Sequence, residues 1–95
     1  VIVVNNGTYG TIRAHQEREF PTRVSGTELV NPDFAALAQS CGLHGELVSE
    51  TAGFDAAFER ALASGKPAIL HCLLDPQAIS AGRTIDELRQ AAMKS

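Results

Sequence analysis

The sequence lacks tryptophan, has one tyrosine, and contains no apolar run near the ~20 residues that a membrane-spanning helix requires. Its formal net charge is -3, so it also lacks the basic balance typical of proteins that bind nucleic acid or anionic membranes. The residues present show no charged-then-apolar leader of the secretory kind. We therefore expect a cytoplasmic protein whose partners include neither nucleic acid nor a membrane.

Cysteine and histidine are few, and neither is arranged as a catalytic or metal motif. Cys41 and Cys72 stand singly without a CxxC spacing, which predicts reduced core cysteines in an intracellular protein and leaves a disulfide between them open. The three histidines lack the HExxH spacing of a metalloprotease. We expect His15 at a solvated helix position, His44 in a turn, and His71 hydrogen-bonded within the core.

The chain opens on four apolar, β-branched residues, 1–4, which predict a strand buried on both faces in the middle of a parallel sheet. This strand is followed by Asn5 and then by residues 6–10, Asn-Gly-Thr-Tyr-Gly, which we call the Asn-Gly loop. Ligands of open α/β sheets lie beyond the carboxyl ends of the strands, so this loop is the first candidate site. Because a folded domain seldom begins with its most buried strand, we also expect the chain to be a fragment of a longer one.

The residues after the loop predict two helices separated by an irregular connection. The first helix covers 11–19 and places the charged cluster at 17–19, Glu-Arg-Glu, on a solvated surface. The connection covers 20–30, where no period is sustained. The second helix has Asn31 as its N-cap, carries an apolar stripe, and ends at Gly42.

The remaining elements are predicted as strand, helix, strand and helix, at residues 45–48, 52–64, 68–74 and from 84 onward. Thr51 is the expected cap of the helix over 52–64, whose apolar face includes Phe58 and Leu62. The last helix begins with Thr84 and Glu87 in the capping-box pattern. This order predicts an α/β layer with parallel strands and right-handed crossovers. About three strands would normally be part of a larger sheet.

The Asn-Gly loop carries groups suited to a magnesium–diphosphate site. Amide and carbonyl oxygens are hard ligands of the kind that magnesium prefers, and Asn6 offers a side-chain oxygen. Gly7 allows a turn that can direct the Thr8 carbonyl to the same ion, and the amides beyond can meet a phosphate. The same Asn-Gly pair is also a common tight-turn signal, so a simple turn stays open here. No carboxylate lies near the loop in sequence.

The loop and several later segments carry a family resemblance. A four-residue apolar strand followed by residues 5–10 is similar to the downstream end of the thiamine-diphosphate motif, which runs from Gly-Asp-Gly through a spacer to Asn-Asn. Residues 31–38, residues 66–70 and the closing Asp75-Pro76 resemble the carboxyl-terminal part of acetolactate-synthase-like and benzoylformate-decarboxylase-like enzymes. The resemblance spans nearly all 95 residues. It identifies 1–95 as the carboxyl-terminal part of the diphosphate-binding domain.

The resemblance implies a fold and a set of site residues. The fold would be part of a three-layer α/β/α domain with a mainly parallel sheet, the thiamine-diphosphate-binding fold. Magnesium would be bound by the Asn6 side chain and the Thr8 backbone carbonyl. Gly7, Tyr9 and Gly10 would lie beside the diphosphate. Asn5 would support the shape of the loop.

The resemblance also implies an activity for the intact protein: a thiamine-diphosphate- and Mg²⁺-dependent carboligase or decarboxylase, a transferase or lyase, acting on 2-oxo acids. The Gly-Asp-Gly aspartate and the glutamate that activates the cofactor lie outside this chain, so its catalytic residues are unknown and the fragment alone should be inactive. Ile12 stands where some decarboxylases of the family carry a catalytic glutamate, which argues against that subgroup. Flavin (FAD) binding, as in some acetolactate synthases, stays open, although no residue of the chain indicates it. The expected partners are the remainder of the chain and a second subunit, in a homodimer or homotetramer.

A second interpretation belongs to a different class of protein. In it the chain is a non-catalytic α/β assembly module, and the Asn-Gly loop is a turn that has lost its cofactor role. An upstream Gly-Asp-Gly some two dozen residues before Asn5 would favour the enzyme, and its absence from the intact protein would favour the module.

Overall fold

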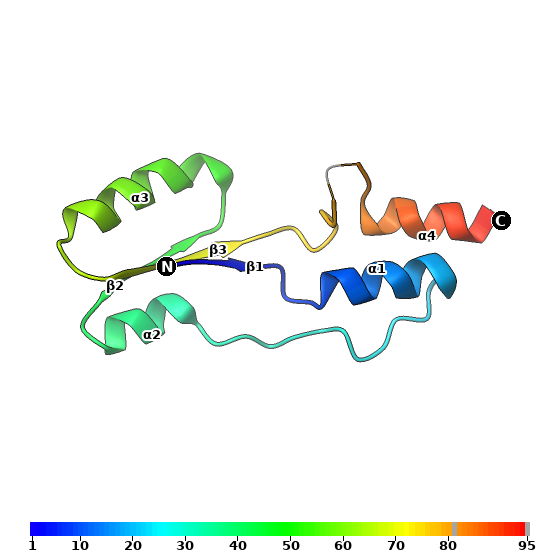
Figure 1. The fold of residues 1–95 in the computed structure, drawn as a ribbon, viewed down its shortest axis with the longest axis horizontal. Coiled ribbons are helices and arrows are strands. Elements are labelled where there is room, and N and C mark those ends of the chain that lie inside the picture. Colours follow the sequence, from blue (N-terminus) through cyan, green and yellow to red (C-terminus); the bar gives the residue numbers. More distant parts are fainter. Residues whose placement is uncertain (81, 95) are drawn as a thin grey trace. The chain divides into compact units, whose positions relative to one another are not determined.

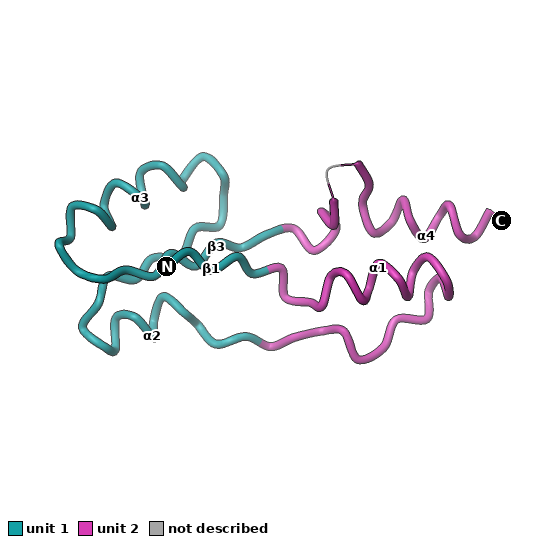
Figure 2. Tube along the Cα trace, viewed as in Figure 1, with its two compact units in different colours: residues 1–5, 31–74 teal, residues 6–30, 75–95 magenta. Residues whose placement is uncertain are grey.

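The computed structural model describes residues 1–80 and 82–94. Within it the chain divides into two compact units, which Figure 2 shows in different colours. Unit 1 comprises Val1–Asn5 and Asn31–Leu74, and unit 2 comprises Asn6–Val30 and Asp75–Ser95. The Asn-Gly loop therefore lies in unit 2, whereas Asn5, the residue before it, ends a strand of unit 1.

Unit 1 is built on a parallel three-stranded sheet (Figure 1). Its strands are β1 (Ile2–Asn5), β2 (His44–Val48) and β3 (Ala68–Leu73), in the spatial order β1-β3-β2. Both pairings are parallel, and His71 in β3 lies opposite Val3 on one side and Leu47 on the other. The predicted α/β class with parallel strands is confirmed. The weak strand expected at residues 45–48 is also confirmed, as β2.

Within the described residues β1 lies at an edge of the sheet, where the sequence predicts a strand buried on both faces. In the described residues β1 pairs with β3 alone, and Ile2 and Val4 are 49% and 62% exposed. The central strand is β3, where Leu70 and His71 are buried. A run of β-branched residues favours an extended conformation at an edge as well as in a centre, so composition could not distinguish the two.

The helices of unit 1 cover both faces of the sheet, with α2 (Phe34–Ser40) and α3 (Phe54–Ala63) on opposite sides in Figure 1. On the α3 side, Val48 and Leu70 form a core with Ala57. The predicted apolar face of α3 is only partly buried, because Phe58 and Leu62 are 40% and 65% exposed. On the α2 side, a Cβ atom at Gly45 would collide with the Ala35 carbonyl. Strand and helix therefore approach as closely as glycine allows.

The structure corrects the predicted N-caps of two helices and the predicted burial of one cysteine. Helix α2 is capped by Asp33, whose carboxylate accepts from the Ala36 amide at 3.0 Å, rather than by Asn31. Thr51 begins a single 3-10 turn, η1 (Thr51–Gly53), and α3 starts after it without a side-chain cap. In both cases a residue nearer the first helical turn occupies the cap position. Cys41 is exposed rather than in the core, whereas Cys72 is buried, and both are free.

His44 begins β2, which corrects its prediction as a turn residue. Its Nε2 lies 3.0 Å from Glu46 Oε2, and the Arg60 Nε atom donates to Glu46 Oε1 at 2.7 Å. The hydrogen bond with His44, followed by that with Arg60, holds the pKa of Glu46 below its usual range, although burial opposes them. This pair is not predicted when residue 44 is placed in a turn, because only within a strand do residues two apart share a face.

Unit 2 consists of two packed helices, α1 (Gly10–Glu19) and α4 (Ile85–Lys94), with the segments that join them to the sheet. Ala14 of α1 packs with Ile85 and Leu88 of α4. The predicted capping box is confirmed, since the Thr84 amide donates to Glu87 at 2.9 Å and the Glu87 amide donates to Thr84 Oγ1 at 3.1 Å. In the described part of the chain, no helix is long and apolar enough to cross a membrane.

Candidate functional site

The strand that leads into the site ends at Asn5, whose side chain and carbonyl are hydrogen-bonded within unit 1. Its Nδ2 lies 2.8 Å from His71 Nε2, its Oδ1 accepts from Asn31 Nδ2 at 2.7 Å, and its carbonyl accepts from the Leu74 amide at 2.8 Å. His71 is 5% exposed and meets the Phe34 ring edge-on, with centroids 5.1 Å apart. The prediction of a hydrogen-bonded core histidine is confirmed. The role of Asn5 in supporting the shape of the loop stays a prediction.

The Asn-Gly loop turns immediately after Asn6. The Thr8 amide donates to Asn6 Oδ1 at 3.2 Å, which closes a turn through the side chain. Gly7 has a φ of +69°, a left-handed conformation that glycine adopts without steric cost. An amide oxygen has two lone pairs, so Asn6 Oδ1 keeps one acceptor position after binding the Thr8 amide.

The backbone of Thr8 is oriented by a short antiparallel bridge to Glu28. Two hydrogen bonds flank this pair, one on each side: the Tyr9 amide donates to the Thr27 carbonyl, and the Leu29 amide donates to the Gly7 carbonyl, each at 2.9 Å. In this pattern the amide and carbonyl of Thr8 itself point to the opposite edge, and the amide meets Asn6 Oδ1 there. No described residue donates to the Thr8 carbonyl. The Asn6 side-chain oxygen and the Thr8 carbonyl therefore share one edge of the loop.

Helix α1 begins directly after these two oxygens. Tyr9 is its N-cap residue, but its side chain makes no capping hydrogen bond, and the first turn contains no acidic residue. The first amides of such a helix, beginning at Gly10, favour an anion. Gly10 itself is tightly enclosed, because a Cβ atom there would lie 2.9 Å from Ile79 Cδ1 and 3.0 Å from Asn6 Nδ2.

This donor set suits one side of a magnesium–diphosphate site. The oxygens of Asn6 and Thr8 are hard ligands, and the uncapped helix start is an anion-binding element. Magnesium is commonly bound with one or two carboxylates as well. Within residues 1–80 and 82–94, no group of three or more acidic, histidine or cysteine side chains could hold a metal ion. The residues fit the ion, but they do not complete its coordination.

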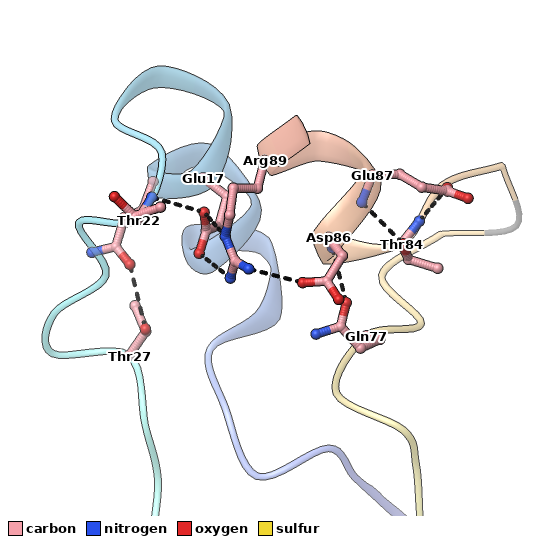
Figure 3. A network of polar contacts seen from close by, with 9 residues as sticks. Glu17, Thr22, Thr27, Gln77, Thr84, Asp86, Glu87 and Arg89 are labelled. Carbon is pink, nitrogen blue, oxygen red and sulfur yellow. Dashed lines mark hydrogen bonds and ion pairs between the residues drawn. The ribbon is translucent and has the colours of Figure 1, made fainter. Parts of the chain in front are cut away.

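Glu17, which the sequence predicts on a solvated surface, is instead buried in the structure. Glu17 is fully buried, and Arg89 of α4 donates to both of its carboxylate oxygens at 2.8 Å (Figure 3). The Thr22 amide donates to Oε2 at 3.2 Å. The hydrogen bond from Arg89 is the main reason that the pKa of Glu17 is held below its usual range, although burial opposes it. One signal was available, because Glu17 follows the buried Ala14 by three residues on the same helix face.

The other charged candidates on α1 are exposed, as predicted. His15 is solvent-exposed and lies within a 3.3 Å hydrogen bond of Arg18 Nη1, and Glu19 is also exposed. Ile12, at the position that carries a catalytic glutamate in some relatives of the predicted family, is 53% exposed.

Comparison with known proteins agrees with the resemblance seen in the sequence. Residues 1–72 match the family described as "Thiamine pyrophosphate enzyme, C-terminal TPP binding domain". The chain is 34% identical over 76 residues to the acetolactate synthase isozyme 2 large subunit of Escherichia coli strain K12, covering 79% of this chain and 14% of that protein. It is 27% identical over 92 residues to the mitochondrial acetolactate synthase catalytic subunit of Saccharomyces cerevisiae, covering 92% of this chain and 13% of that protein.

A third relative is the putative thiamine pyrophosphate-containing protein YdaP of Bacillus subtilis strain 168, 33% identical over 79 residues. That alignment covers 78% of this chain and 12% of the relative. The chain thus spans about one-seventh of the length of the curated proteins it matches. The chain belongs to the thiamine pyrophosphate enzyme family, in the region of the C-terminal TPP-binding domain, and is acetolactate-synthase-like.

Proposed function

We propose that this chain supplies one side of the magnesium–diphosphate site in a thiamine-diphosphate-dependent carboligase or decarboxylase that acts on 2-oxo acids. The observation that carries the proposal is the common orientation of two oxygens, those of the Asn6 side chain and the Thr8 backbone, just before the uncapped start of α1. The acetolactate synthases among the relatives support the reaction class.

Each residue of the loop has a part in this proposal. Asn6 Oδ1 and the Thr8 carbonyl bind Mg²⁺, and Gly7 permits the turn that brings them to one edge. Tyr9 and Gly10 place the first amides of α1 beside the diphosphate. The cofactor, when bound, supplies the electron sink for breaking or making the carbon–carbon bond next to a 2-oxo acid carbonyl. The residues described here bind and orient it.

The rest of the site is proposed to come from outside this chain. A carboxylate ligand would complete the magnesium coordination, which Asn6 and Thr8 leave open. We also propose that the activating acid belongs to a second subunit of a homodimer or homotetramer, and that the protein works in the cytoplasm. No residue of this chain is assigned a proton-transfer step.

The test is isothermal titration calorimetry of the full-length protein with thiamine diphosphate and Mg²⁺. Removing a group that hydrogen-bonds or ligates a charged partner reduces the free energy of binding by roughly 1.5–3 kcal/mol. This loss corresponds to a roughly 10- to 150-fold rise in Kd. We expect a loss in this range for Asn6→Ala. Asn6→Asp is the matched variant, because it keeps an oxygen for the ion and an acceptor for the Thr8 amide, and it should bind within about fivefold of wild type.

Two results would contradict the proposal at different levels. Equal binding by wild type and Asn6→Ala would remove Asn6 from the metal site. If the wild-type protein binds neither thiamine diphosphate nor Mg²⁺, the cofactor function itself is wrong, and the non-catalytic assembly module takes its place.

A further inference from the structure

Glu17 is a buried acid to which the proposed cofactor site assigns no role. Its side chain has no exposed surface, yet both carboxylate oxygens are satisfied, by Arg89 and by the Thr22 amide. A buried carboxylate is tolerated where its charge is paired and its lone pairs are occupied. Arg89 is itself held by Asp86, to which its Nη1 donates at 2.9 Å (Figure 3). The pair therefore joins α1 to α4 at a defined point.

The same carboxylate also holds the segment that follows α1. Thr22 has a φ of +68°, a left-handed conformation that a β-branched residue rarely adopts. Its amide donates to Glu17 Oε2, so the contact is made by a residue in an unfavourable backbone state. A conformation of this kind persists when the surrounding structure imposes it. Glu17 is the part of that surrounding structure in direct contact with Thr22.

Gln16, the neighbour of Glu17 in α1, binds the same segment further along. Its Nε2 donates to the Ser25 carbonyl at 2.8 Å, and its Oε1 accepts from Thr27 Oγ1 at 3.3 Å. The segment over 22–28 is thus attached to α1 at three residues by two consecutive side chains. Figure 3 shows the contact between Glu17 and Thr22 at the start of this segment.

Thr27 connects this segment to the Asn-Gly loop. It is 2% exposed, and its carbonyl accepts from both the Tyr9 amide at 2.9 Å and Thr8 Oγ1 at 2.7 Å. Glu28, the next residue, pairs with Thr8 in the bridge that directs the Thr8 carbonyl toward the Asn6 edge of the loop. Hydrogen bonds therefore link Arg89 to Glu17 and Glu17 to Thr22, and the backbone of the 22–28 segment leads from Thr22 to Thr27, which binds Thr8.

We propose that Glu17 is a positioning residue for the Asn-Gly loop, which it holds in its ligand-binding orientation through the 22–28 segment, with Arg89 as its essential partner. The inference rests on the proposed function of the loop. It adds a residue that touches neither cofactor nor metal. It also gives a role to α4, which lies beyond the 1–72 region matched by the family.

The variant Glu17→Gln tests the proposal in the full-length protein. It keeps the size of the side chain but places an NH₂ group against a donor of Arg89 or Thr22. We expect hydrogen exchange at the Thr8 and Tyr9 amides, measured without cofactor, to become at least tenfold faster. The Kd for thiamine diphosphate with Mg²⁺, measured by calorimetry at a temperature where the variant is folded, should rise about five- to tenfold. Glu46→Gln is the matched control, since it weakens another glutamate–arginine pair, and it should change both values less than twofold.

A double-mutant cycle distinguishes positioning from a general loss of stability. Thr27→Val removes the hydroxyl that binds Gln16 and keeps the carbonyl that binds Tyr9. If Glu17 acts through this segment, Glu17→Gln combined with Thr27→Val should accelerate exchange at Tyr9 little beyond the larger single effect. Fully additive effects would overturn the proposal.

Two further outcomes are decisive. If Glu17→Gln lowers the melting temperature while the Thr8 and Tyr9 amides and the cofactor Kd stay at wild-type values, Glu17 is structural only. Should Glu17→Gln fail to fold, Arg89→Lys keeps the charge and loses the two-point contact, and exchange at Tyr9 less than twofold faster would overturn the proposal. A wild-type protein that binds no cofactor would instead refute the proposed function. The exchange data are measured without cofactor, so they would still show whether Glu17 orients the loop.

Discussion

Replacing Arg89 with methionine keeps an apolar stem and removes the guanidinium that binds both oxygens of Glu17. The variant leaves a fully buried carboxylate without its main partner. Removing one member of a buried ion pair costs roughly 3–5 kcal/mol. Because 26% of the Arg89 side chain is exposed and the Thr22 amide still donates, we expect the lower end of this range, about 3 kcal/mol.

Native-state hydrogen exchange on the full-length protein is the suitable assay, because it resolves the opening of α1 and α4 from that of other regions. A loss of about 3 kcal/mol corresponds to exchange roughly 150-fold faster. Arg60→Met is the control, since Arg60 also binds a glutamate but its side chain is 57% exposed. An exposed pair is worth ~0–1 kcal/mol. If Arg89→Met accelerates exchange in α1 no more than Arg60→Met does in α3, the reasoning is refuted.

The same variant should carry a pH signature. In the wild type the Arg89 hydrogen bond is the largest cause that holds the pKa of Glu17 below its usual range. A lowered folded pKa adds stability above the unfolded pKa, and this contribution is lost as the pH falls through the folded value. In Arg89→Met, burial without the partner should raise the pKa of Glu17. The exchange ratio of variant to wild type should therefore shrink from pH 7 towards pH 4, and a constant ratio would contradict this account.

Two further predictions concern unit 1. Gly45→Ala places a Cβ atom against the Ala35 carbonyl, so it should destabilise the contact between β2 and α2 by about 1–3 kcal/mol. Hydrogen exchange in β2 should become correspondingly faster. Gly53→Ala is the control, because a Cβ atom at Gly53 would face open space and should leave this exchange unchanged. A thiol reagent applied to the native protein should label Cys41 and spare Cys72, whereas unfolding should expose both; rapid native labelling of Cys72 would be inconsistent with its burial.

The sequence by itself determined features that depend on neighbouring residues. The capping box of Thr84 and Glu87 and the turn at Gly7 were predictable, because their hydrogen bonds or backbone conformations involve residues within a few positions. The alternation of strands and helices followed from hydrophobic periodicity and helix-end signals. The choice of Asn6 and Thr8 as candidate ligands came from a family resemblance, and it stays a proposal.

Tertiary structure decided which of the described strands is central and which acid is buried. β1 and β3 have similar apolar sequences, and their positions depend on pairing between residues more than 60 positions apart. Glu17 is buried because Arg89, 72 residues away, supplies its counter-charge. The orientation of the Thr8 carbonyl depends likewise on Thr27 and Leu29. Propensity acts over one or two turns of chain, whereas burial and charge pairing depend on contacts that exist after the chain has folded.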